Sequence, residues 1–101
     1  MGRPNKAHTA TANRIAYRYG AEMNTDAEDG EIDIRADGFS IAVETTATLE
    51  QSVRRWSEHD QPIYVAVTNR EALGEALRLV ADTRVGVMDP QGIIVKEAAP
   101  P

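Results

Sequence analysis

The segment that decides the fold occupies residues 31–44 and reads EIDIRADGFSIAVE. Its first half alternates apolar and charged residues with a period of two, which is typical of a strand with one buried face. Asp37 and Gly38 follow as a pair favoured in tight hairpin turns, and a second apolar run comes after them. The segment therefore predicts a β-hairpin with strands at residues 31–35 and 39–44.

The sequence on either side of the hairpin predicts helices and further strands. Gly20 is expected to end a first helix, Thr48 and Gln51 have the form of a capping box that opens a second, and Asn69 is expected to cap a third. The expected helices span residues 7–20, 48–59 and 69–80. The further strands are expected at residues 63–67, 85–88 and 93–95. An exposed acidic loop is expected at residues 22–31 and a turn at residues 89–92. This pattern predicts an α/β fold with a mixed central sheet flanked by helices, in the order αββαβαββ.

Length and composition limit the classes that remain. The chain has 101 residues and no cysteine, which is enough for one small domain and excludes disulfide frameworks and thiolate zinc sites. No apolar run reaches the roughly 20 residues that span a bilayer, so we expect a cytoplasmic protein. The expected organisation is a flexible basic arm at residues 1–6, a single domain at residues 7–97 and a tail at residues 98–101.

Charge is distributed unevenly along the chain. The formal net charge is -5, yet the first 21 residues contain four basic residues and no acid, namely Arg3, Lys6, Arg14 and Arg18. Tyr17 lies between the last two arginines. A basic end on an acidic body predicts DNA as the partner, held by these five residues. Most of the 11 basic residues are arginines, which together with the acidic body suggests a halophilic, salt-adapted source.

Two acids interrupt otherwise apolar strands of the predicted hairpin. Asp33 and Glu44 would lie side by side on neighbouring strands, and the Thr45 carbonyl would add a third oxygen. Oxygen ligands of this kind suit Mg²⁺ or Mn²⁺, which polarises a phosphodiester and activates a bound water. Arg35 alternates in phase with Asp33 and is expected to stabilise charge on the phosphate, since a permanently protonated guanidinium is no base. The alternative interpretation is a pair of solvent-facing acids balanced by arginines.

The element order resembles that of the restriction-endonuclease-like (PD-(D/E)xK) superfamily: an opening helix, a hairpin, then a helix and a strand. Asp33 on the first strand of the hairpin and Glu44 at the end of the second match the positions of the two acids of that family. The resemblance covers most of residues 7–97 and is nearest to small archaeal Holliday-junction-resolvase-like members. It implies that Asp33 and Glu44 bind metal and that Gln51 lies near the phosphate. Thr46 stands where the family has its lysine, so the resemblance implies an eroded catalytic set.

Two functions follow as hypotheses. The first is a DNA-binding nuclease-fold protein with a degenerate metal-dependent phosphodiesterase site; if it were active it would be a Mg²⁺- or Mn²⁺-dependent endonuclease. The second is a non-catalytic protein–protein interaction module that keeps the fold as a scaffold, for instance as a homodimer through an exposed helix or strand edge. DNA affinity that falls steeply with salt favours the first, and salt-independent self-association favours the second.

Overall fold

Six strands form one mixed sheet, in which the strands lie side by side in the order of the sequence. The computed structural model describes residues 6–23, 32–57 and 61–99. Strands β3, β4 and β5 run parallel, while β1, β2 and β6 join the sheet through antiparallel pairs. The elements are α1 (Lys6–Tyr19), β1 (Glu22–Met23), β2 (Ile34–Ala36), β3 (Phe39–Glu44), α2 (Leu49–Trp56), β4 (Ile63–Val67), the 3₁₀ turn η1 (Arg70–Ala72), α3 (Leu73–Val80), β5 (Gly86–Met88) and β6 (Ile94–Lys96).

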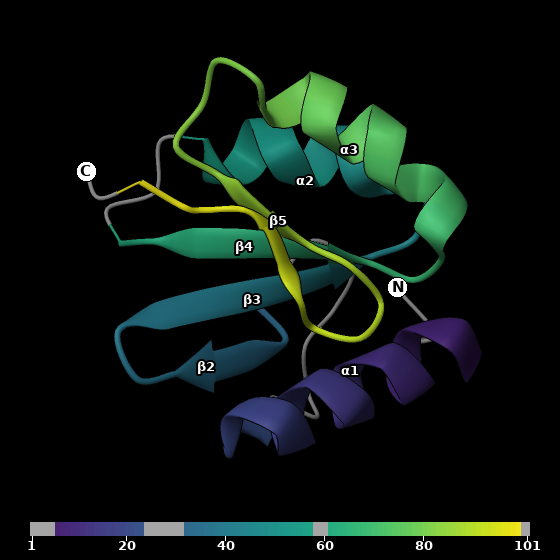
Figure 1. Ribbon diagram of the computed structural model, residues 1–101, viewed down its shortest axis with the longest axis vertical. Coiled ribbons are helices and arrows are strands. Elements are labelled where there is room, and N and C mark those ends of the chain that lie inside the picture. The colour runs from purple at the N-terminus through teal and green to yellow at the C-terminus, as the bar shows by residue number, and fades with distance from the viewer. Residues whose placement is uncertain (1–5, 24–31, 58–60, 100–101) are drawn as a thin grey trace.

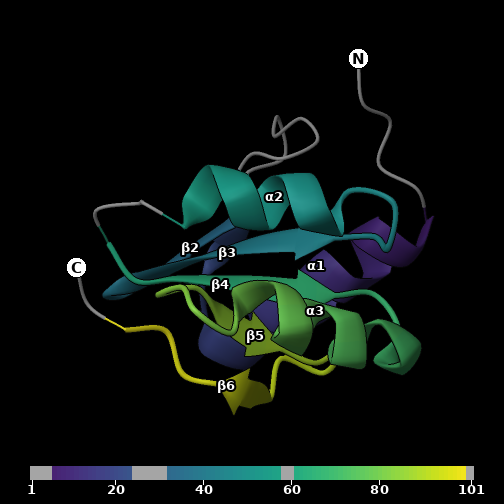
Figure 2. The same cartoon turned by 90° about the horizontal axis from the view of Figure 1, so that it is seen from above.

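The helices cover both faces of the sheet. Figure 1 shows α2 and α3 on one face and α1 on the other, and Figure 2 shows the same arrangement from above with β6 at one edge. One core cluster lies under α2 and α3 and includes Val65 and Val87, and a second lies under α1 and includes Ile15 and Ile41. All four side chains are fully buried, so the sheet contributes to two cores.

The expected fold class is confirmed as a mixed α/β sheet flanked by helices. Strands β3 and β4 have the predicted limits, and Gly20 ends α1 with a positive φ of 59° that suits glycine. Trp56 packs against the core under α2 and α3. None of the described helices is long and apolar enough to cross a membrane.

The prediction of a loop beginning at Glu22 is wrong at its start. Residues Glu22 and Met23 form β1, which pairs antiparallel with β2 and places Glu22 opposite Arg35. The element order is therefore αβββαβαββ rather than αββαβαββ. Two residues are too few to show an alternating pattern, so only pairing with β2 defines this strand. The rest of the expected acidic loop, residues 24–31, lies outside the described residues.

The predicted capping box at the start of α2 is also wrong. Thr48 precedes the helix, but its side chain makes no capping hydrogen bond and donates to Glu44 instead. Gln51 is exposed. Asn69 caps as expected, because its side chain accepts a hydrogen bond from the amide of Ala72, although the first turn that it caps is the 3₁₀ turn η1.

The turn between β5 and β6 forms where the sequence predicts it. The Asp89 amide donates to the carbonyl of Ile93, and the Gly92 amide donates to the carbonyl of Asp89. Gly92 has a φ of 83°, and a Cβ there would lie 3.0 Å from the Arg18 Cδ, so the position requires glycine. Past β6, Ala99 donates to the carbonyl of Arg84, which ties the described part of the expected tail to the domain.

Candidate functional site

The two acids singled out by the sequence lie at the same end of neighbouring strands. Asp33 comes directly before β2, and Glu44 is the last residue of β3. Both are buried, with exposed fractions of 6% and 2%. They are close enough that the charge of Asp33 contributes to raising the pKa of Glu44. The hairpin therefore brings the two carboxyl groups together, as expected from a turn at Asp37 and Gly38.

Asp33 uses both of its carboxylate oxygens within the protein. Its Oδ1 lies 3.1 Å from the Nε2 of His8 on α1, and its Oδ2 accepts a hydrogen bond of 2.8 Å from the backbone amide of Val43 on β3. A buried carboxylate normally requires such partners, because ionised groups lose their hydration inside a protein. Asp33 thus joins α1 to the hairpin.

Glu44 is less well satisfied. Its Oε1 accepts a hydrogen bond of 2.5 Å from the Thr48 hydroxyl, whereas its buried Oε2 has no hydrogen-bond partner among the described residues. Burial raises its pKa above the usual 4.5; the Thr48 and Ser52 hydroxyls oppose this rise, Asp33 adds to it and His8 reduces it. The Ser52 hydroxyl makes no hydrogen bond of ordinary geometry, so its effect is weaker than that of Thr48. The protonated form of Glu44 is favoured relative to an exposed glutamate.

The proposed oxygen ligands do not form an open divalent site. Both oxygens of Asp33 are occupied, Thr48 donates to Glu44, and the Thr45 carbonyl already accepts from the amide of Thr48 at 3.1 Å. Within residues 6–23, 32–57 and 61–99, no group of three or more His, Asp or Glu side chains is arranged to hold a metal ion. Among the described residues, the Oε2 of Glu44 is the one oxygen of the acid pair without a protein partner, which is fewer than the several oxygen ligands that Mg²⁺ or Mn²⁺ takes, so the donor set as folded does not fit either ion.

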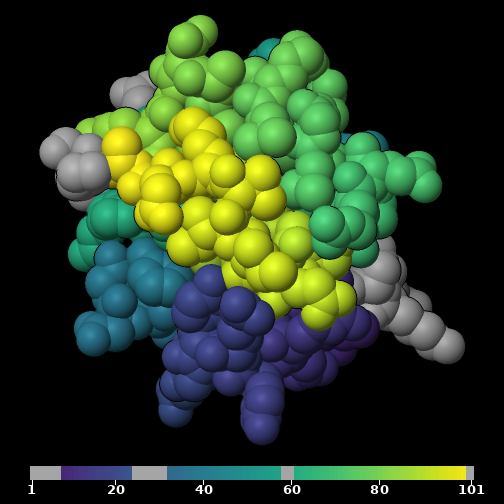
Figure 3. Space-filling view, in the orientation of Figure 1, coloured from purple at the N-terminus to yellow at the C-terminus, as the bar shows by residue number. Residues whose placement is uncertain are grey.

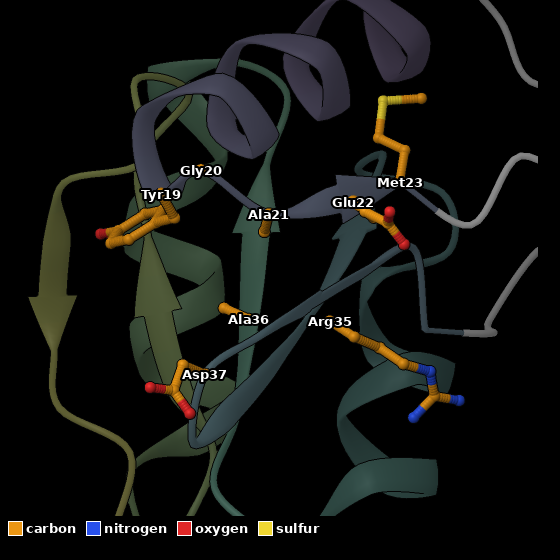
Figure 4. Close-up of a pocket in the computed structure, with 8 residues that line it drawn as sticks. All are labelled: Tyr19, Gly20, Ala21, Glu22, Met23, Arg35, Ala36 and Asp37. Atoms are coloured by element: carbon orange, nitrogen blue, oxygen red, sulfur yellow. The ribbon is translucent and has the colours of Figure 1, made fainter.

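The other predicted catalytic residues lie apart from the acid pair. Thr46 is exposed in the turn before α2, and Gln51 is exposed on α2 itself. Arg35 lines a pocket of about 430 Å³ between the end of α1 and the edge of the sheet, together with Glu22 and Asp37 (Figure 4). Neither Asp33 nor Glu44 lines that pocket. Arg35 is therefore placed beside acids of the sheet edge rather than beside the buried pair.

No described lysine takes the place of the missing motif lysine. The Lys96 amine donates hydrogen bonds to the carbonyls of Val80, Thr83 and Val85, at 3.2, 3.1 and 2.7 Å. Desolvation lowers the pKa of this amine. Lys96 therefore holds the segment between α3 and β5 against the last strand.

The predicted DNA-binding residues that the structure describes lie on α1. Arg14, Tyr17 and Arg18 are exposed, and the Tyr17 side chain is 90% exposed. Lys6 is the first residue of α1, but its side chain is not among those described, and Arg3 lies outside the described residues. Since the opposite face of α1 buries its apolar residues in the core, the helix presents these side chains on a fixed support.

Sequence reasoning missed three residues at this end of the molecule. His8 reaches Asp33 across 25 positions of the sequence, Ser52 faces Glu44 from α2, and Arg70 lies 3.2 Å from Asp89. A serine one turn into an amphipathic helix and a histidine among small polar residues carry no local signal of such contacts. Asp89 was the one detectable hint, because an acid that directly follows an apolar strand needs a partner.

Comparison with known proteins does not identify a family. No protein-family model matches the chain, and neither does any curated protein or solved structure.

Proposed function

We propose that this chain is a DNA-binding protein of restriction-endonuclease-like architecture whose metal-dependent phosphodiesterase site has degenerated. The proposal rests mainly on the present state of Asp33 and Glu44. They occupy neighbouring strand ends, as nuclease ligands would, but three of their four carboxylate oxygens are directed to His8, Val43 and Thr48. Thr46, in place of the motif lysine, is consistent with a site that no longer cleaves.

Glu44 supports the idea of a degenerate site because the fold alone gives it little use. A buried glutamate with one unpartnered oxygen and a raised pKa lowers stability relative to a neutral residue of the same shape. Residues that lower stability are concentrated at present or former functional sites. We therefore interpret Glu44 as the remnant and Asp33 as the acid that the fold has taken over.

DNA binding is supported by the helix that carries His8. Arg14 lies six residues further along α1, or about 9 Å along its axis, and Arg18 follows one turn later. Both are exposed, and the Tyr17 ring between them is open to solvent for contact with a sugar or base. The helix that supplies the partner of Asp33 thus also carries the exposed basic residues.

The first test measures DNA binding against salt. Labelled branched and linear DNA are titrated with the wild type, with Arg14→Ala/Arg18→Ala, and with the control Arg54→Ala/Arg55→Ala, which removes the same charge from the exposed face of α2. We expect affinity to fall with salt in the wild type and the control, and to be weakened at least tenfold in the α1 variant. Equal loss in both variants, or no binding by the wild type, would contradict the proposal.

The second test concerns metal and cleavage. Mn²⁺ is titrated calorimetrically into the wild type and Glu44→Ala, and both proteins are incubated with the same DNAs. We expect no saturable Mn²⁺ binding and no cleavage, because protein groups engage both oxygens of Asp33 and one of Glu44, which leaves the Oε2 of Glu44 as the one unpartnered oxygen of the pair. Binding and cleavage by the wild type that vanish in Glu44→Ala would show a working nuclease instead.

One observation favours the second candidate, a protein–protein interaction module. Ile93, directly before β6, and Val95 on β6 are 48% and 43% exposed, and β6 is an outer strand of the sheet. The register between β5 and β6 shifts at Val87 and Met88, however, and such a bulge makes an edge less regular for strand addition. Salt-independent self-association that Val95→Lys abolishes, without DNA binding, would establish this candidate.

A further inference from the structure

The turn between β5 and β6 is held rigidly from within. The Asp89 carboxylate accepts hydrogen bonds from the amides of Gln91 and Ile93, at 2.8 and 3.0 Å. Asp89 and Pro90 are buried although they belong to a turn. Figure 1 shows this turn between α1 and the connection from β4 to α3, and Figure 3 shows the C-terminal segment directly against α1. The turn therefore gives neighbouring side chains a fixed point of attachment.

Three arginines, two from α1 and one from η1, meet at this turn. Arg14 donates from Nη1 to the Pro90 carbonyl at 2.9 Å, and Arg70 donates from Nη1 to the Asp89 carboxylate at 3.2 Å. The Arg18 side chain lies over Gly92, with its Cδ 3.0 Å from where a Cβ would be. All three residues are exposed, and the Arg70 side chain is 71% exposed. Hydrogen bonds to the turn anchor the Arg14 and Arg70 guanidinium groups, the Arg18 side chain lies against Gly92, and all three residues stay exposed to solvent.

The charge at the turn is opposite to that of the chain as a whole. Three arginines contact the turn that contains the single carboxylate of Asp89, although Arg70 alone bonds that carboxylate, and the local charge is 3 minus 1, or +2, on a chain with a formal net charge of -5. Glu71 follows Arg70 on η1, but neighbouring residues of a 3₁₀ turn project about 120° apart. A local positive charge on an acidic protein is typical of a surface that recognises a polyanion.

We infer that Arg14, Arg18 and Arg70 form one surface that binds the phosphate backbone of DNA, with Arg70 as its third, sequence-distant member. This inference rests on the proposed function and extends it from α1 to the β5–β6 turn. Each guanidinium retains N–H groups beyond those bonded to the turn, in a planar arrangement that suits phosphate oxygens. Because the turn already restricts these side chains, binding costs less conformational entropy than it does for free arginines.

The test compares salt slopes for single variants. Arg70→Ala, Arg70→Lys and the control Arg54→Ala are titrated with the labelled DNA at several salt concentrations. Arg54 is a matched control, since it is also exposed and bonded to one carboxylate, that of Glu50. For Arg70→Ala we expect the slope of log affinity against log salt to fall by about 0.9 and affinity to drop roughly five- to tenfold near 0.1 M salt. Arg70→Lys should keep the slope, because it keeps the charge.

The outcomes separate the inference from the function on which it rests. If Arg14→Ala/Arg18→Ala loses DNA affinity while Arg70→Ala keeps the wild-type salt slope, the proposed function stands, but Arg70 does not belong to the phosphate-binding surface and the inference fails. If Arg54→Ala loses as much as Arg70→Ala, the effect is one of overall charge and the inference fails. No DNA binding by the wild type overturns both. An effect of Arg70→Ala on the melting temperature alone indicates a merely structural arginine and also overturns the inference.

Discussion

Two buried aspartates, Asp33 and Asp89, have nearly the same surroundings in different parts of the fold. Their exposed fractions are 6% and 3%. Each accepts hydrogen bonds from backbone amides and each lies near one basic side chain, His8 for Asp33 and Arg70 for Asp89. In the sequence, however, Asp33 resembles a metal ligand and Asp89 the first residue of a turn. An acid beside an apolar strand therefore does not by itself distinguish a chemical site from a structural one.

The difference between the aspartates lies in what each one organises. Asp89 accepts from two amides of its own turn, so its role is local, whereas Asp33 accepts from Val43 and reaches His8, so it joins three separate elements. The basic partner of Asp89 is exposed and always charged, and that of Asp33 is largely buried. The comparison predicts that both acids stabilise the protein, and the following substitutions test this.

The largest effect is expected for Asp89→Ala. The substitution removes the acceptor for two backbone amides in a buried turn, so the free energy of unfolding should fall by about 3 kcal/mol. Urea denaturation measures the change. The exposed Asp82, substituted in the same way, should remain within about 0.5 kcal/mol of the wild type. A loss as small as that of the control would mean that the turn does not depend on its aspartate.

Asp33→Ala should follow with a loss of about 2 kcal/mol, because one buried amide and His8 lose their partner. The same denaturation series measures it. This variant can break the comparison outright. If Asp33 served mainly as a metal ligand, its removal in the absence of metal would change the free energy of unfolding little. An Asp33→Ala protein as stable as the wild type would therefore favour the ligand role for Asp33.

A pH series on Glu44→Gln should give a smaller effect of opposite sign. Since the folded-state pKa of Glu44 is raised above 4.5, the folded state binds more protons than the unfolded state between pH 4.5 and that raised pKa. The wild type therefore loses stability as pH rises through this interval, and Glu44→Gln does not. We expect the free energy of unfolding of the variant to rise relative to that of the wild type as the pH rises through this interval. A constant difference would exclude a raised pKa.

The smallest change in stability is expected for Arg70→Ala. The Arg70 side chain is 71% exposed, so solvent screens its pairing with the buried Asp89 and the pair contributes about 1 kcal/mol at most; the Asp89 carboxylate also keeps its two amide donors when Arg70 is removed. Thermal melts should show little change even where DNA affinity falls. If Arg70→Ala lost as much stability as Asp89→Ala, Asp89 would depend on its basic partner, and the turn amides alone would not account for its stabilising effect.

Sequence patterns predicted the parts of the fold that depend on local periodicity. The apolar runs of β3 and β4, and the spacing of Ala72, Ala76 and Val80 along η1 and α3, agree with the structure. Strand β1 has no pattern of its own and exists through its pairing with β2. A strand of this kind cannot be predicted from the sequence before the position of its partner strand is known.

The candidate site was predictable only as a pair of positions. The hairpin requires Asp33 and Glu44 to be neighbours, but which group each carboxylate contacts depends on how α1 and α2 pack. Thr48 illustrates this limit. Its hydroxyl could cap α2 or donate to Glu44, and in the structure it donates to Glu44, because the buried acid is the stronger acceptor. The residues that close the site come from elements distant in sequence, so local patterns do not reveal them.

Acylation of Lys96 can measure local opening of the fold. An amine that donates to three carbonyls has no lone pair free for an acylating reagent, so acylation at this position waits until the segment between α3 and β5 releases it. The rate of labelling at Lys96 then reports how often the last strand leaves the sheet. Mass spectrometry reads this rate directly, because Lys6 is the other lysine of the chain and lies at the opposite end of the sequence.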